Sequence, residues 1–142
     1  MISIKILIEK VLSRYSAAII GLGQIGLGYD YSNSNPDLVL THASALQLHN
    51  DFEIVAAVDP LQKQRDKFRD KFLTPTFNNL KDLYQECNPD IIVIAVPEDH
   101  HVDVFLEVIE HYPKAIVLEK PVTNDYISAK TLLKIATERK CP

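Results

Sequence analysis

Four short segments of the chain are almost continuously apolar, at residues 17–21, 53–59, 91–96 and 115–119. Strands buried on both faces of a parallel sheet have this pattern, whereas strands with one exposed face alternate between apolar and polar residues. A brief segment at residues 76–77 predicts one further strand. The pattern therefore predicts a mostly parallel sheet of short strands.

Segments with helical spacing of apolar residues separate these strands and follow the last one. They cover residues 41–48, 62–72, 80–87, 101–111 and 125–139. Asn78 is the expected N-cap of the third helix, and Thr123 or Asn124 that of the last. Strands that alternate with helices in this way predict an α/β fold, a doubly wound parallel sheet with right-handed crossovers.

Two regions follow this pattern less regularly. In residues 2–12 the isoleucines alternate as in a strand, but apolar residues also recur at helical spacing. We expect a helix there, because residues 13–16 lead directly into the first core strand. Residues 29–37 are polar and rich in turn-forming residues, which predicts a loop inserted into the helix that would otherwise follow the first strand.

The composition is that of one globular domain. The chain has 142 residues, of which 46% are apolar and 24% charged, and a formal net charge of -4. The negative charge argues against a nucleic-acid partner, and no apolar run approaches the roughly 20 residues that span a membrane. The apolar N-terminus is interrupted by Lys5, Glu9 and Lys10, whereas a secretory signal has an uninterrupted apolar stretch. Two distant cysteines, Cys87 and Cys141, predict reduced thiols and a cytoplasmic protein.

All four glycines of the chain fall within residues 21–28, and three of them form the motif Gly21-x-Gly23-x-x-Gly26. The motif leaves an apolar strand and opens a helix, which is the context of a dinucleotide-binding turn. Gly21 would permit the tight turn, Gly23 the close approach of the backbone to a pyrophosphate, and Gly26 close helix–strand packing. The alternative is a structural turn without a ligand. On the first interpretation, residues 1–16 are an N-terminal extension and residues 17–142 a dinucleotide-binding Rossmann domain.

Asp59 ends the second predicted strand. An acidic residue at this position accepts hydrogen bonds from the adenosine ribose and repels a 2′-phosphate, which favours NAD over NADP. Asp59 lies well beyond the usual spacing of about 20 residues from the last glycine, and the insertion at residues 29–37 accounts for much of the excess. An N-cap role is the alternative. The basic residues Lys63 and Arg65 lie close downstream, so a pocket for the 2′-phosphate of NADP is the alternative.

The last two long strands also end in polar residues. Because ligands of open α/β sheets lie at the carboxyl ends of strands, we expect the segment Pro97-Glu98-Asp99-His100-His101 to line the same crevice. Glu98 or Asp99 can instead cap the next helix, with both histidines exposed on its first turn. No group of cysteine, histidine and carboxylate residues has the spacing of a zinc site.

The fifth strand ends in Glu119-Lys120-Pro121. A lysine at this edge can donate a hydrogen bond to a substrate hydroxyl or take part in proton transfer. The alternative is a solvated surface pair.

Four segments, GLGQIG, VAAVDP, IAVPEDHHVD and VLEKPVT, together resemble the N-terminal domain of the Gfo/Idh/MocA oxidoreductase family. This family includes glucose–fructose oxidoreductase and inositol 2-dehydrogenase, and the resemblance runs from about Ala17 to the last helix. It implies that the pyrophosphate contacts five residues and that the ribose contacts Asp59. The five are Gly21, Gly23, Gln24, Ile25 and Gly26.

For the nicotinamide end, the resemblance implies that Pro97 and His101 lie beside the nicotinamide and that Glu119 and Lys120 form the family's Glu-Lys-Pro motif. Lys120 would then lie by nicotinamide and substrate as the catalytic residue. Pro121 would follow a cis peptide bond. Two positions depart from the family pattern, since Glu98 replaces an asparagine and Val96 a threonine.

The resemblance implies an oxidoreductase that transfers hydride between NAD(P) and a sugar, inositol or related polyol. Family members carry a second domain, which holds the substrate and a histidine-containing catalytic motif, and no such domain is found in these 142 residues. The isolated chain is therefore expected to be inactive and to self-associate into a homo-oligomer through the surface that such a domain covers. The alternatives are a non-catalytic nucleotide-binding or regulatory module and a methyltransferase domain that uses adenosylmethionine.

Overall fold

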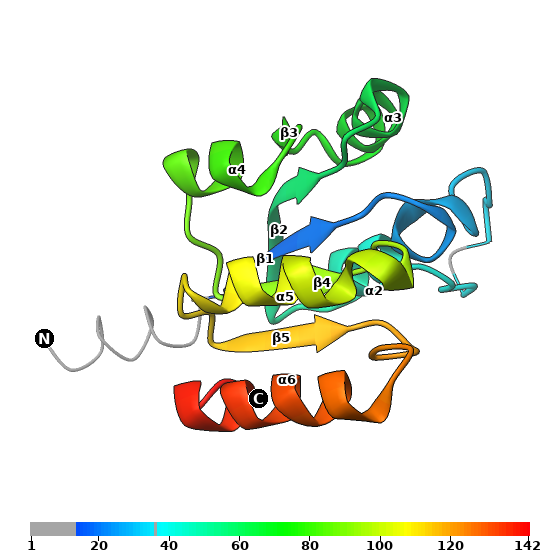
Figure 1. The fold of residues 1–142 in the computed structure, drawn as a ribbon. Coiled ribbons are helices and arrows are strands. Elements are labelled where there is room, and N and C mark those ends of the chain that lie inside the picture. Colours follow the sequence, from blue (N-terminus) through cyan, green and yellow to red (C-terminus); the bar gives the residue numbers. More distant parts are fainter. Residues whose placement is uncertain (1–13, 36) are drawn as a thin grey trace, which may run out of the picture.

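A computed structural model describes residues 14–35 and 37–142. The helix expected at residues 2–12 lies outside the described residues. Five parallel strands form one sheet in the order β3-β2-β1-β4-β5 (Figure 1). Their bounds are Tyr15–Ile20 for β1, Phe52–Val58 for β2, Thr76–Phe77 for β3, Ile91–Ile94 for β4 and Ala115–Leu118 for β5. The predicted doubly wound parallel sheet is confirmed.

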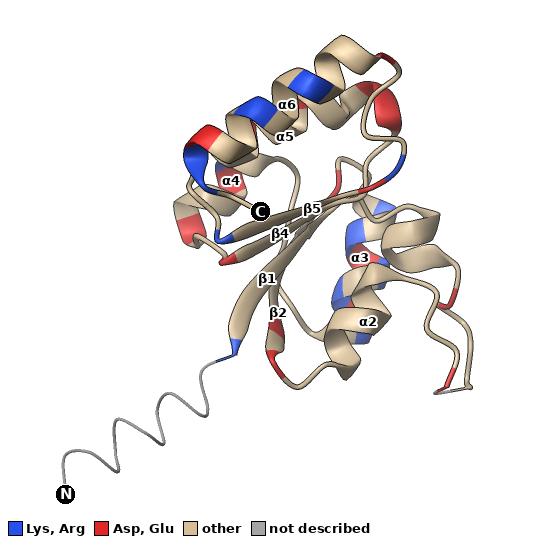
Figure 2. Ribbon diagram, turned by 90° about the horizontal axis from the view of Figure 1, so that it is seen from below, with Lys and Arg blue, Asp and Glu red and all other residues tan. Residues whose placement is uncertain are grey.

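Helices cover both faces of this sheet (Figure 2). The longer ones are α2 (His42–Leu48), α3 (Gln62–Phe72), α4 (Leu80–Glu86), α5 (His101–Ile109) and α6 (Tyr126–Arg139). Helices α4, α5 and α6 pack on one face, and α2 and α3 on the other. Figure 2 also shows that the strands carry charge only near their ends, because both of their faces are covered.

The core is divided between the two faces. On one face, Ile20 and Ile94 pack with residues of α4, α5 and α6, while on the other Ile19 and Val93 pack with residues of α2 and α3. Successive strand residues point to opposite faces, so a strand between two helical layers must be apolar at nearly every position. This explains the continuous apolar runs in the sequence.

Two helix caps lie one or two residues beyond their predicted positions. Asn79, rather than Asn78, accepts a hydrogen bond of 2.8 Å from the Asp82 N–H at the start of α4. Asp125, rather than Thr123 or Asn124, accepts one of 2.8 Å from the Ser128 N–H at the start of α6. Adjacent residues with equally suitable side chains compete for each cap, and the backbone conformation decides between them.

The insertion after the glycine motif forms a loop in its described residues, 29–35 and 37. The glycine turn opens η1 (Gln24–Gly28), a single π-helical turn whose bonds include Gly28 N–H to Gly23 O at 3.0 Å. Among the described residues between η1 and α2 there is no further helix, which confirms the predicted interruption. The Asp30 carboxylate closes the loop by accepting bonds from Leu40 N–H (2.8 Å), Thr41 N–H (3.1 Å) and the Thr41 hydroxyl (2.7 Å).

Asp30 is buried, with 3% of its surface exposed. Burial by itself raises the pKa of this carboxyl, but the hydrogen bonds from Leu40 and Thr41 outweigh that effect and hold the pKa below its usual value. Lys71 on α3 anchors the loop from outside by donating to the carbonyls of Asp30 and Tyr31. The two ends of the loop are therefore tied together by the buried Asp30 and Thr41, next to the glycine turn.

Candidate cofactor site

A cavity of about 770 Å³ lies at the carboxyl ends of β1, β2 and β4. It is located where the strand order reverses between β1 and β4, the position at which open α/β sheets bind ligands. Seven of the sequence-predicted site residues line it: Gly21, Gly23, Gln24, Ile25, Asp59, Val96 and Pro97. The structure thus brings the glycine turn, the acidic residue and the loop after β4 to one place.

The three glycines of the motif have different surroundings. Gly21 has a φ of +94°, and a Cβ there would lie 2.5 Å from the Ala95 carbonyl oxygen. A Cβ on Gly26 would collide with the Gly21 carbonyl oxygen, whereas one on Gly23 would meet nothing within 4 Å. Gly21 and Gly26 are therefore required by the fold itself. Gly23 leaves open space on the cavity wall, as the close approach of a phosphate group requires.

Asp59 connects the glycine turn to α3. One carboxylate oxygen accepts a hydrogen bond from Leu22 N–H at 2.8 Å, and the other accepts one from Leu61 N–H at 2.8 Å. Asp59 is not the N-cap of α3, because Leu61 occupies that position. Each carboxylate oxygen accepts two hydrogen bonds. The buried Asp59 therefore retains acceptor capacity on the cavity wall.

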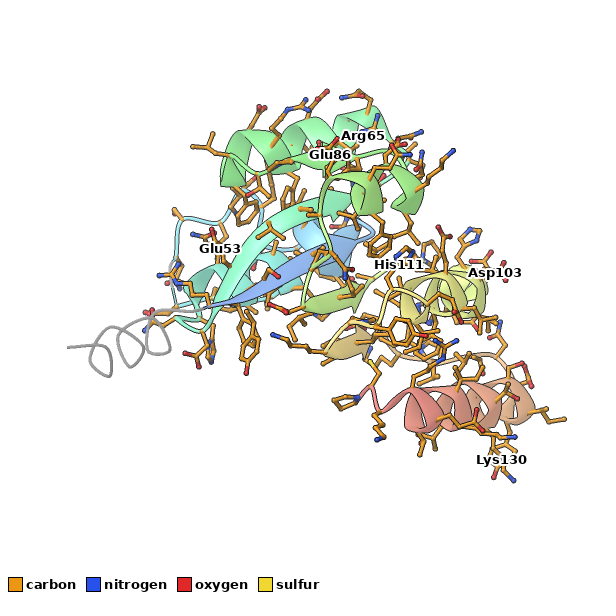
Figure 3. All side chains as sticks on the ribbon, turned by 90° about the vertical axis from the view of Figure 1, so that its left-hand side faces the viewer. Glu53, Arg65, Glu86, Asp103, His111 and Lys130 are labelled. Atoms are coloured by element: carbon orange, nitrogen blue, oxygen red, sulfur yellow. The ribbon has the colours of Figure 1, made fainter. Side chains whose placement is uncertain are left out.

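Arg65 is one of the two basic residues considered for a 2′-phosphate pocket. Its side chain makes hydrogen bonds within the protein. Its guanidinium donates to the Asp59 carbonyl at 2.5 Å, to Gln62 Oε1 at 2.5 Å and to Asn78 Oδ1 at 3.3 Å. Figure 3 shows Arg65 on α3 and Asp103 on α5, the helices on opposite faces of the sheet. The Arg65 side chain supports the loop that carries Asp59.

His101 does not line the cavity, although the resemblance implied a place beside the nicotinamide. Only 1% of its surface is exposed, which also overturns the alternative of an exposed histidine. Its Nε2 lies 3.0 Å from the Val96 carbonyl oxygen, and its Nδ1 lies 3.0 Å from that of Pro121. The reason is the short helical turn η2 (Glu98–His100), after which the His101 side chain faces the interior.

Glu98 also lies outside the residues that line the cavity. Neither Glu98 nor Asp99 makes the expected capping bond, since Pro97 is the residue at the N-cap of this turn. Both are located in the first turn, where a negative charge interacts favourably with the helix dipole. His100, by contrast, is exposed and lines the cavity.

The Glu119-Lys120-Pro121 turn has the expected cis peptide bond between Lys120 and Pro121. None of its three residues lines the cavity. Glu119 Oε1 lies 2.8 Å from His42 Nε2, and each of these two side chains is 21% exposed. Lys120 is exposed. His42 therefore contacts this turn at Glu119, and His101 contacts it at Pro121.

Sequence reasoning missed several residues of the site. His42 was not found because its partner lies 77 positions away and no local pattern indicates the pair. Asn78 lines the cavity and directly follows β3, so the rule that ligands lie at strand carboxyl ends could have identified it. Asp103, Val104 and Glu107 line the cavity from α5. The exposed face of an amphipathic helix gives no signal of this kind.

Within residues 14–35 and 37–142, no three histidine, cysteine or carboxylate side chains lie close enough together to hold a metal ion. No helix of the described part of the chain is long and apolar enough to cross a membrane.

The fold is similar to that of many solved structures. Three examples are the WlbA dehydrogenase from Bordetella pertussis with NADH and UDP-GlcNAcA (22% identity, TM-score 0.74), myo-inositol 2-dehydrogenase from Lactobacillus plantarum (22%, 0.72) and a 3-ketoreductase from Actinomadura kijaniata with TDP-benzene and NADP (17%, 0.73). They cover 90%, 89% and 91% of this chain. The chain spans 36%, 34% and 37% of theirs, about a third of each.

A comparison with curated protein sequences found no match. The sequence profile of the Gfo/Idh/MocA group, described as "Oxidoreductase family, NAD-binding Rossmann fold", matches residues 15–142. This match covers all the strands and helices described above. The chain therefore belongs to the Gfo/Idh/MocA oxidoreductase family and is its NAD-binding Rossmann domain.

Proposed function

We propose that the 770 Å³ cavity holds NAD, with the pyrophosphate on the glycine turn and the adenosine ribose at Asp59. The observation that carries this proposal is the open space at Gly23, between two glycines that the fold itself requires. Backbone N–H groups of the turn would bind the phosphates. The predicted contacts are Gly21, Gly23, Gln24, Ile25 and Gly26.

We propose NAD rather than NADP as the cofactor. The Asp59 carboxylate would accept hydrogen bonds from the ribose hydroxyls and repel a 2′-phosphate at the same position. Arg65 donates to the Asp59 carbonyl, to Gln62 and to Asn78, so its guanidinium is engaged in the protein rather than free for a phosphate.

The nicotinamide end would extend past Val96 and Pro97 toward the Glu119-Lys120-Pro121 turn. The cofactor supplies the hydride chemistry, and the protein provides binding and orientation. Lys120, exposed at this edge, would donate a hydrogen bond to the substrate hydroxyl. Glu98 and Pro121 lie next to this region in sequence, and His101 supports it from the interior.

We propose that the substrate is a sugar, inositol or related polyol. The support is the family, together with structural neighbours described as dehydrogenases of inositol and of a sugar nucleotide. A second domain outside these 142 residues would supply the substrate pocket and the base. The isolated chain would then bind NAD without oxidising any polyol, and NADH formation from a panel of sugars and inositols would contradict this view.

A titration of the chain with NADH, followed by the cofactor's fluorescence, tests the role of Lys120. If Lys120 lies by the nicotinamide, Lys120→Ala should weaken NADH binding about two- to tenfold and change the fluorescence of the bound nicotinamide. Lys130→Ala, on α6 (Figure 3), is the matched control because it removes another exposed lysine. Equal binding by both variants would favour a non-catalytic nucleotide-binding module instead.

A further inference from the structure

The two oxygens of the Glu119 carboxylate have different hydrogen-bond partners. Its Oε1 lies 2.8 Å from His42 Nε2, and its Oε2 accepts a hydrogen bond from the Lys120 backbone N–H at 3.3 Å. The Lys120 ammonium is the nearest cation in sequence, yet it has no hydrogen-bond or ion-pair partner among residues 14–35 and 37–142. The carboxylate is therefore directed to the histidine and not to the adjacent lysine.

The position of His42 is fixed by the loop that precedes it. Thr41 is the N-cap of α2, with its hydroxyl accepting from Ser44 N–H at 3.2 Å, and the same hydroxyl donates to Asp30 at 2.7 Å. Asp30 and Thr41 are both buried, with 3% and 4% of their surfaces exposed. His42 follows directly as the first residue of the helix, so its ring is presented to Glu119 from a buried, hydrogen-bonded helix start.

The hydrogen bond between the two side chains does not require a charged histidine. A neutral ring protonated at Nε2 donates to a carboxylate just as the imidazolium does. Removal of the ring would leave the partly buried Glu119 without a side-chain partner, and a long flexible carboxylate then pairs with the nearest available cation.

We propose that His42 is a positioning residue that holds Glu119 away from Lys120 and so keeps the lysine ammonium free for the substrate hydroxyl. This inference rests on the role proposed for Lys120. It adds that the loop between η1 and α2 contributes to the site through the contacts from Asp30 to Thr41 and from His42 to Glu119. Through these contacts, the loop would keep the Lys120 ammonium unpaired with Glu119.

The test measures how fast the Lys120 amine of the unliganded chain reacts with an acetylating reagent, quantified for each lysine by mass spectrometry. Pairing with a carboxylate stabilises the ammonium form, so the amine reacts more slowly. His42→Ala should lower the Lys120 rate about two- to fivefold relative to Lys63 in the same molecule. The double variant His42→Ala/Glu119→Gln should return to the wild-type rate.

His42→Gln separates positioning from a merely structural role, because its amide N–H can still donate to Glu119 and should retain the wild-type rate. His49→Ala, which removes an exposed histidine elsewhere, is the matched control and should change nothing. An unchanged Lys120 rate in folded His42→Ala would overturn the proposal, as would a slower rate that persists in the double variant. The acetylation rate is measured without NADH, so the His42 proposal can fail or succeed independently of the cofactor assignment.

Discussion

At the scale of single residues, three glycines of one turn meet three different surroundings. Gly21 needs its positive φ, Gly26 packs against a backbone carbonyl, and Gly23 faces open space. A sequence motif treats the three positions alike. The structure assigns two of them to the fold and one to the ligand, which leads to opposite predictions for the same substitution.

Gly23→Ala should leave the free energy of unfolding within about 1 kcal/mol of wild type but weaken NADH binding about tenfold or more, since its methyl group would occupy the phosphate position. Gly26→Ala should instead cost about 2 kcal/mol or more of stability, because its methyl group meets the Gly21 carbonyl. Urea unfolding and an NADH titration of both variants measure the two effects. Similar stability losses in both would contradict the assignment of Gly23 to the ligand.

Asp30 gives a prediction for pH dependence. Hydrogen bonds from Leu40 and Thr41 hold its pKa below the usual value in the folded chain. A carboxyl of this kind stabilises the fold above the unfolded-state pKa of about 4, and the contribution is lost as the pH falls through the lower folded-state pKa. Asp30→Asn should cost about 1–3 kcal/mol at neutral pH.

The difference in unfolding free energy between wild type and Asp30→Asn should therefore shrink below about pH 4. Urea unfolding over a pH series provides the measurement. Other carboxyls, such as Asp90 and Asp125, also have lowered pKa values, but they are present in both proteins and cancel in the difference. A difference that stays constant down to low pH would show that Asp30 contributes no charge-dependent stability.

At the scale of elements, local sequence patterns predicted most of the fold. The strands were identifiable because burial on both faces demands continuous apolar residues, and α3 has the predicted bounds. The caps of α4 and α6 were wrong by one or two residues because neighbouring residues are equally good caps. The π-helical form of η1 was not predicted, since no local signal distinguishes its hydrogen bonds from those of an α-helix.

The start of α5 carries two adjacent histidines in opposite environments. His101 is buried between the Val96 and Pro121 carbonyls, whereas His100 is exposed. His101→Ala should cost about 2–4 kcal/mol of unfolding free energy, because it leaves a cavity and unpaired carbonyl groups. His100→Ala should cost less than about 0.5 kcal/mol.

Thermal or urea unfolding of the two histidine variants distinguishes a structural His101 from a cofactor-binding one. The family resemblance implied that His101 lies beside the nicotinamide. Loss of NADH affinity without loss of stability in His101→Ala would support that cofactor-binding role. The burial of His101 has a physical cause. A motif fixes the position of a histidine in the chain, but the turn η2 decides which way its ring faces.

At the scale of the whole molecule, the site depends on topology. Gly23, Asp59 and Val96 come from three separate strand ends, and the reversal of strand order between β1 and β4 opens a cavity among them. The rule that ligands lie at the carboxyl ends of parallel strands predicted from the sequence that these residues would lie close together. The His42–Glu119 contact was not predictable, because it depends on how α2 and the end of β5 approach one another across the fold.

A calorimetric titration of the chain with NADH and then with NADPH tests the central claim most directly. We predict a single saturable site for NADH and binding of NADPH at least about tenfold weaker, because the buried Asp59 carboxylate repels the 2′-phosphate. No saturable binding of NADH, or binding of NADPH as tight as that of NADH, would contradict it.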